Sequence, residues 1–365
     1  MRRGLRWFTA AAAATMLCGC NLGYIARGAY EEARILWNRK PIPQVIANPE
    51  LAPEIRERLE TVLAVRDFDR DQLGLTVGNA YTSVSPVDTG AIVHVVMATP
   101  RDSLEPYQWW FPIVGSVPYR GYFNESDAQA LASEMEAQGY DTMVRPAVAF
   151  SSLGFFNDPL LSNLLRLNKV ELAGVITHEL FHRTYFLPSN VTFDESAANY
   201  VGTRGAVEFF KRTEGDSAPD TIAARGIFDS DVKFAHFLLQ AQAKLLRIYG
   251  SDLPKDEKLK RREVAFEEIK ADYAKLKPTL SGLERFDLDK EPLNNAVLIN
   301  YLIYFHDLDN FVALERMNHG DVRATIERII EIAKAHSDDP FYAISQAIRD
   351  APAAQTSLDL LNPPG

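Results

Sequence analysis

The feature that most constrains this chain is the segment His178-Glu179-Leu180-Phe181-His182, an HExxH pattern set in an apolar stretch. Residues four apart project from the same face of an α-helix, so His178 and His182 can each place an imidazole nitrogen about 2.0–2.1 Å from one zinc ion. The residues around them are apolar on nearly all sides of such a helix, which predicts that it is buried. Two histidines and a glutamate inside a buried helix are costly unless they are paired or bind something. The pattern therefore predicts a zinc site.

Glu179 follows the first histidine directly, and in this arrangement a glutamate hydrogen-bonds the zinc-bound water without ligating the metal. Zinc lowers the pKa of its water to about 7, so a modest carboxylate base then yields a hydroxide-like nucleophile. The sequence therefore predicts Glu179 as the general base of a hydrolytic reaction.

The third protein ligand expected at a catalytic zinc is Glu195, which twelve residues separate from His182. Proline and asparagine within that gap favour a turn, and a second helix starting near Phe193 and running back along the first would present Glu195 to the metal. Asn199, four residues on, shares that face and is predicted to orient the Glu195 carboxylate. Two alternatives stay open, because Thr192 and Glu195 also fit a capping box and Asp194 is a second possible ligand.

The first nineteen residues have the layout of a secretory signal, with three arginines, an apolar run over Trp7–Leu17 and small residues before Cys20. This segment resembles a bacterial lipoprotein signal, in which the cysteine that follows the cleavage site is acylated, and it predicts Cys20 as that residue. A plain signal peptide or an uncleaved anchor is the alternative. Cys18 and Cys20 are the only cysteines, so a chain cleaved before Cys20 can form no internal disulfide.

The net charge of the chain limits which binding partners are expected. The chain carries a net charge of −10, and losing the three arginines of residues 1–19 moves it to −13. Such a balance argues against nucleic acid or anionic lipid as a binding partner. No other stretch of the sequence is long and apolar enough to span a bilayer, so we expect membrane attachment through the lipid anchor alone.

The periodicity of the chain predicts an α+β fold of the zincin-like class. Helical spacing over Tyr24–Trp37 and a helix from Pro53 to about Arg66 precede apolar runs typical of buried strands, at 91–98 and 142–150. After Thr192 the chain is predicted to be helical. We expect a single domain over residues 20–365, with a sheet-bearing part at about 67–150, the active-site helices at about 159–212 and a helical part at about 213–350. Asp158-Pro159 predicts the start of the first of those helices, and Asn168 with Glu171 predicts a capping box for the HExxH helix.

Several segments together resemble a bacterial family of lipoproteins assigned as aminopeptidases. They are HELFH with the twelve-residue gap and F-D-E-S-A, W-W-F-P-I-V-G-S-V-P-Y-R-G-Y-F at 109–123, S-S-L-G-F-F-N-D-P at 151–159, W-N-R-K-P-I at 37–42 and L-N-N-A at 293–296. The resemblance covers nearly the whole chain after the signal, and it implies that His178, His182 and Glu195 are ligands and Glu179 is catalytic. The chain differs from the usual family pattern at Phe181, Arg183 and Asp194.

We therefore expect a zinc-dependent peptidase, more specifically an aminopeptidase, held in the bacterial cell envelope and acting on peptides. Two other functions fit the same residues: a zinc hydrolase of a non-peptide envelope substrate, and a non-catalytic lipoprotein that acts as a binding partner. An intact Glu179 argues against the second, because a structural metal needs no base. Zinc hydrolases also need a donor for the developing oxyanion, for which Tyr301 is the candidate, with core packing as its alternative role.

Overall fold

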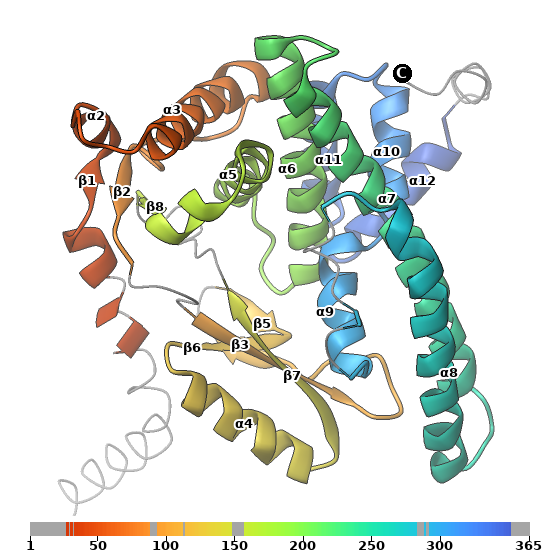
Figure 1. The fold of residues 1–365 in the computed structure, drawn as a ribbon. Coiled ribbons are helices and arrows are strands. Elements are labelled where there is room, and N and C mark those ends of the chain that lie inside the picture. Colours follow the sequence, from red (N-terminus) through yellow and green to blue (C-terminus); the bar gives the residue numbers. More distant parts are fainter. Residues whose placement is uncertain are drawn as a thin grey trace, which may run out of the picture.

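The computed structural model describes residues 27–28, 30–31, 33–87, 93–111, 114–147, 157–282, 288–289 and 292–351. Over these residues the chain is a mixed α+β protein in which helices predominate (Figure 1). This confirms the α+β class expected from the sequence. The predicted signal at 1–19, the acylation site Cys20 and residues 151–156 of the S-S-L-G-F-F-N-D-P segment lie outside the described residues.

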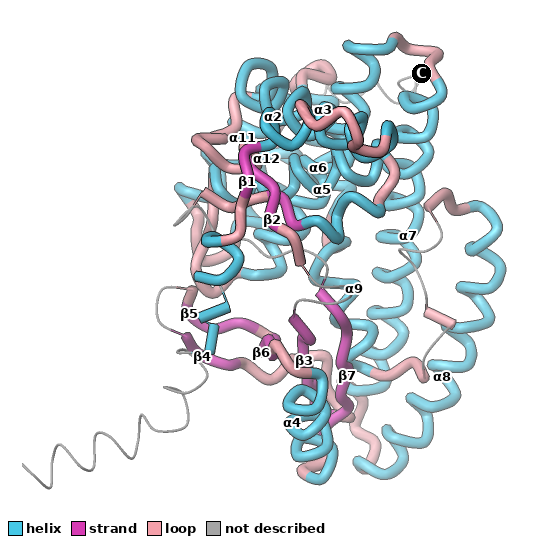
Figure 2. Tube along the Cα trace, turned by 60° about the vertical axis from the view of Figure 1, so that its left-hand side comes forward, coloured by secondary structure: helices cyan, strands magenta, loops and turns pink. Residues whose placement is uncertain are grey.

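An antiparallel sheet forms one layer of the molecule, with the strand order β6–β3–β7. Its strands are β3 (Val93–Pro100), β6 (Tyr119–Tyr122) and β7 (Tyr140–Ala147). Side chains alternate between the two faces of a strand, and directly paired residues share a face. Val96 packs with the helix α4 (Glu125–Ala137) on one face. Val95 and its partner Arg145 therefore point to the opposite face, where Val95 joins the main core and Arg145 donates to Asn300. The helical part lies on that side of the sheet, opposite α4 (Figure 2).

Two helices at the centre of the fold carry the HExxH segment and the sequence after it. The helix α5 spans Lys169–Thr184 and begins with the predicted capping box, in which the Asn168 side chain accepts from the Glu171 N–H and Glu171 accepts from the Asn168 N–H. The helix α6 spans Val191–Glu214. Both are largely buried, because the apolar residues that surround the histidines pack on all sides.

The predicted helix start at Pro159 is wrong. Residues Leu160–Leu161 form the strand β8, which pairs in parallel with β2 (Ser83–Ser85), and a 3-10 turn at Ser162–Arg166 precedes α5. The Asp158 carbonyl accepts a hydrogen bond from the Tyr81 N–H at 2.8 Å. Pairing with a distant strand therefore overrides the local N-cap signal of Asp158-Pro159.

The remaining elements enclose this centre. The strand β1 (Lys40–Pro41) pairs with β2. The aromatic segment at 109–123 contains the antiparallel pair of β4 (Trp109–Phe111) and β5 (Gly115–Val117). The other α-helices are α2 (Ile42–Ile46), α3 (Pro53–Phe68), α7 (Pro219–Tyr249), α8 (Lys255–Leu276), α9 (Asn295–Phe305), α10 (Leu308–Met317), α11 (Val322–Ala335) and α12 (Pro340–Arg349). The predicted helical character after Thr192 is thus confirmed over the described residues. None of the described helices combines the length and the apolar character that crossing a bilayer requires.

Candidate metal centre

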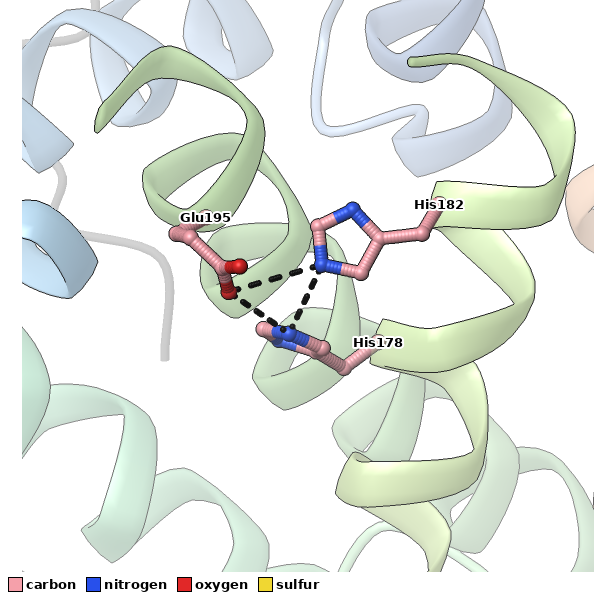
Figure 3. Close-up of side chains that lie close together, drawn as sticks. All are labelled: His178, His182 and Glu195. Carbon is pink, nitrogen blue, oxygen red and sulfur yellow. Dashed lines mark hydrogen bonds and ion pairs between the residues drawn. The ribbon is translucent and has the colours of Figure 1, made fainter. Parts of the chain in front are cut away.

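Three predicted ligands converge where α5 meets α6 (Figure 3). The Nε2 atoms of His178 and His182 lie 3.1 Å apart, and the Oε2 atom of Glu195 lies 3.3 Å and 3.4 Å from them. Ligand atoms at 2.0–2.1 Å from one ion in a tetrahedral arrangement are separated by about 3.3 Å. The three observed separations match that value, so one ion fits at the centre of the triangle with a fourth position left open.

The chemistry of the donor set also fits zinc, because two imidazole nitrogens and one carboxylate oxygen are common ligands of catalytic zinc. His178 and Glu195 keep 16% and 13% of their side-chain exposure, against 6% for His182. The donor atoms are therefore largely desolvated, and the site is still open to solvent from the side of His178 and Glu195. A buried anionic oxygen between two imidazoles is a suitable environment for a cation.

Electrostatic coupling within the triangle is strong. Burial alone would lower the pKa of His182, but the Glu195 carboxylate outweighs it and the pKa is raised to about 9. Burial alone would raise the pKa of Glu195, but His182 and His178 outweigh it and hold that pKa below its ordinary value. The carboxylate thus stays ionised and attracts positive charge to the imidazole nitrogens. A metal ion would take the place of the additional proton on the His182 imidazole, since metal ligation needs the neutral imidazole.

Glu179 lies beside this triangle without belonging to it, since the potential donor group in the described residues consists of His178, His182 and Glu195. Burial raises the pKa of Glu179, and the charges of His178 and His182 lower it in part. A half-buried carboxyl next to a candidate metal site, with its pKa raised above the ordinary value, is suited to accept and return a proton.

The alternatives for the third ligand are distinguished by their contacts. Asn190 is the N-cap residue of α6 and makes no side-chain cap, so Glu195 is not paired with Thr192 in a capping box. Asp194 accepts the Leu187 N–H at 3.0 Å through Oδ1, and burial raises its pKa to about 8. Glu195, and not Asp194, therefore faces the two imidazoles.

Asn199, predicted to orient Glu195, lies on the buried side of α6. Its side-chain amide is 3.5 Å from Oδ2 of Asp231, a fully buried residue of α7. This contact ties α6 to α7 one turn beyond Glu195. The orienting role stays a prediction.

The helix α9 supplies a side chain that sequence reasoning did not select. Tyr301, the predicted oxyanion donor, packs its ring edge-on against Phe234 of α7, with ring centroids 5.4 Å apart. Tyr304, one turn further on, lies nearly parallel to the His178 imidazole at a centroid distance of 6.3 Å and accepts a hydrogen bond from Arg145 at 3.1 Å. Arg145 was also missed, although a lone charged residue within an apolar strand is itself a signal, because a buried charge is costly without a role.

The described residues thus form a mostly helical protein in which two imidazoles and a carboxylate from adjacent helices make up a possible metal-binding triad. The family model described as "Putative aminopeptidase" matches residues 23–340, and the chain belongs to this family. The aminopeptidase part of the family predicted from the sequence motifs is thereby confirmed. No curated protein and no solved structure matches the chain.

Proposed function

We propose that this protein is a zinc-dependent peptidase of zincin-like architecture, and more specifically an aminopeptidase. The observation that carries the proposal is the triangle of His178 Nε2, His182 Nε2 and Glu195 Oε2, with sides of 3.1–3.4 Å. Membership of the aminopeptidase family supports peptide bonds as the target. These three side chains would hold the ion, and Glu179 would serve as the general base.

When bound, zinc would supply a water of lowered pKa and polarise the carbonyl of the peptide bond. The chain's own contribution is proton transfer. As the water oxygen bonds to the carbonyl carbon, Glu179 takes a water proton and the carbonyl π electrons move onto oxygen. When the carbon–nitrogen bond breaks, Glu179 returns that proton to the departing amine. The first products are a carboxylic acid and an amine, and a second proton then passes from the acid to the amine to give a carboxylate and an ammonium group at neutral pH. The single carboxyl of Glu179 thus acts first as base and then as acid.

We also propose that the protein is exported, cleaved before Cys20 and anchored to a membrane of the bacterial envelope by acylation of that residue. The support is the layout of residues 1–20, with a basic start, an apolar run and a terminal cysteine. The peptidase would then act at a membrane surface on peptides in the envelope.

The test combines metal analysis with a peptide digest. The chain from residue 21 onward is purified without its anchor, its zinc content is determined by elemental analysis, and a mixed peptide library is digested with and without chelator and analysed by mass spectrometry. We expect about one zinc per chain and stepwise, chelator-sensitive loss of N-terminal residues. Internal cuts would identify an endopeptidase, and zinc with every peptide intact would favour a non-peptide substrate or a binding role.

Glu179→Gln is the matched variant, because it keeps the shape of the side chain and removes its basicity. It should keep zinc bound and lose turnover. An active Glu179→Gln protein would remove Glu179 from the role of base.

A further inference from the structure

A cation is held beside the candidate metal centre by neutral partners. Arg145 of β7 donates from Nε to the Asn300 Oδ1 atom at 2.6 Å and from Nη2 to the Tyr304 hydroxyl at 3.1 Å. In the described part of the chain both hydrogen-bond partners of this half-buried guanidinium are uncharged. The Glu195 carboxylate acts on this guanidinium through space without a hydrogen bond, so the charge of Arg145 lies within electrostatic reach of the candidate metal centre.

The two partners of Arg145 sit on one face of α9, because Asn300 and Tyr304 are four residues apart. A planar guanidinium can bind both at once, and a lysine could not reproduce that fork. The start of α9 is anchored on the strand that carries Arg145: the Asn295 N–H donates to Asp141 Oδ2 at 3.1 Å, and the Asn294 amide donates to a β7 carbonyl at 3.0 Å. The register between α9 and β7 is therefore fixed.

This arrangement leaves the Tyr304 hydroxyl with a proton to donate. Its oxygen accepts the N–H of Arg145, and among the described residues its own proton has no acceptor. A tyrosine hydroxyl has an ordinary pKa of about 10, so it carries its proton at neutral pH. The Tyr304 ring faces His178, one of the candidate metal ligands. The Tyr304 ring therefore borders the candidate metal centre.

We propose that Tyr304 is the hydrogen-bond donor to the carbonyl oxygen of the scissile bond as that oxygen becomes negative, and that Arg145 is the positioning residue that fixes and polarises the Tyr304 hydroxyl. The inference rests on the proposed hydrolytic function and assigns the oxyanion donor to Tyr304 in place of Tyr301. Tyr304 keeps its proton throughout, so the proton balance stays with Glu179. When a hydroxyl accepts a hydrogen bond from a charged donor, the hydrogen bond that the hydroxyl itself donates becomes stronger. Arg145 therefore makes Tyr304 a better donor.

Tyr304→Phe tests the donor, and Tyr301→Phe is the matched control on the same helix. Both are compared with the wild-type protein for zinc content, for kcat and KM on one cleaved peptide, and for binding of a phosphonate peptide analogue by calorimetry. We expect Tyr304→Phe to keep its zinc, to lower kcat by about 10²–10³-fold with KM changed little, and to weaken the phosphonate by a similar factor. Tyr301→Phe should change none of these.

An active wild type whose Tyr304→Phe variant keeps kcat and phosphonate affinity within about threefold overturns this inference alone. The same holds if Tyr301→Phe loses as much as Tyr304→Phe. A wild-type protein that binds no zinc and cleaves no peptide overturns the proposed function and this inference together.

Arg145→Met tests the positioning role by a double-mutant cycle. Because Arg145 acts through the tyrosine hydroxyl, Arg145→Met should lower kcat about tenfold in the wild type and less than about twofold in the Tyr304→Phe background. Equal losses in both backgrounds would show that Arg145 supports the fold only, and would overturn its assignment as a positioning residue.

Discussion

The helices α5 and α6 approach closely where Gly174 faces Gly202, and replacing Gly202 should disturb the candidate metal centre. A Cβ atom added at Gly202 would lie 2.7 Å from the Gly174 carbonyl oxygen and 3.0 Å from the Cβ atom of His178. A Cβ atom at Gly174 would lie 3.7 Å from the Gly202 carbonyl oxygen, an ordinary contact. Of these two glycines, only Gly202 faces the opposite helix too closely for a side chain, and the residue it would press on is a candidate ligand.

The size of the effect follows from these distances. To bring the 2.7 Å contact to an ordinary 3.4 Å, the helices must separate by roughly 0.7 Å, because closely packed interiors leave no room for the extra methyl. The distances from Glu195 to the imidazoles, now 3.3 Å and 3.4 Å, would open by a similar amount. Metal–ligand distances tolerate only about 0.2 Å, so we expect Gly202→Ala to weaken zinc binding by about 10–100-fold.

Stability should change less than metal affinity. Overpacking costs about 1–3 kcal/mol, and replacing glycine inside a helix returns about 1 kcal/mol. The free energy of unfolding of metal-free Gly202→Ala should therefore fall by about 0–2 kcal/mol, whereas Gly174→Ala should be neutral or stabilised by up to about 1 kcal/mol.

The assay is a competition titration of zinc against a chromophoric chelator, together with denaturant unfolding of the metal-free proteins. Gly174→Ala should bind zinc like the wild type, which separates the effect of the contact from that of any glycine substitution. Wild-type zinc affinity in a folded Gly202→Ala protein would refute the view that the close approach of α5 and α6 sets the ligand geometry.

The remaining predictions concern one ligand, one buried acid and the anchor. Glu195→Ala should reduce zinc well below one per chain by elemental analysis; a stoichiometry that stays at one would make Asp194 or another group the ligand. Asp69 is buried and accepts from Thr177, and burial raises its pKa well above the ordinary value, so the native state binds more protons than the unfolded state and loses stability as pH rises above about 4. The unfolding free energy of Asp69→Asn, measured by denaturant titration, should therefore exceed that of the wild type by about 1–3 kcal/mol at pH 8. The difference should shrink toward about pH 4, and a difference that does not change with pH would contradict this reasoning. Cys20→Ser should leave the protein unacylated and move it from the membrane fraction to the supernatant; unchanged partitioning would favour an uncleaved helix.

The parts of the site that could be predicted from the sequence are those set by local spacing. His178 and His182 share a helix face whatever the rest of the chain does, and the capping box of Asn168 fixes where that helix begins. The prediction of Glu195 as the third ligand required one further inference, that a turn is followed by a helix running back along the first. The short segment between His182 and Glu195 allows few other arrangements. The N-cap signal at Asp158 failed because the chain there pairs with a strand about 75 residues earlier.

Tyr304 shows why the other half of the site could not be derived in the same way. Tyr301 and Tyr304 are equivalent in composition and spacing, and only the rotation of α9 about its axis decides which ring meets His178. That rotation is set by the anchoring of Asn294 and Asn295 on β7, contacts that join residues more than 150 positions apart. The candidate metal ligands all lie on two consecutive helices. The hydrogen-bond donor that we assign to the oxyanion depends instead on how α9 packs against the sheet. Variants at Asn295 that leave α5 and α6 intact should accordingly disturb turnover before they disturb zinc binding.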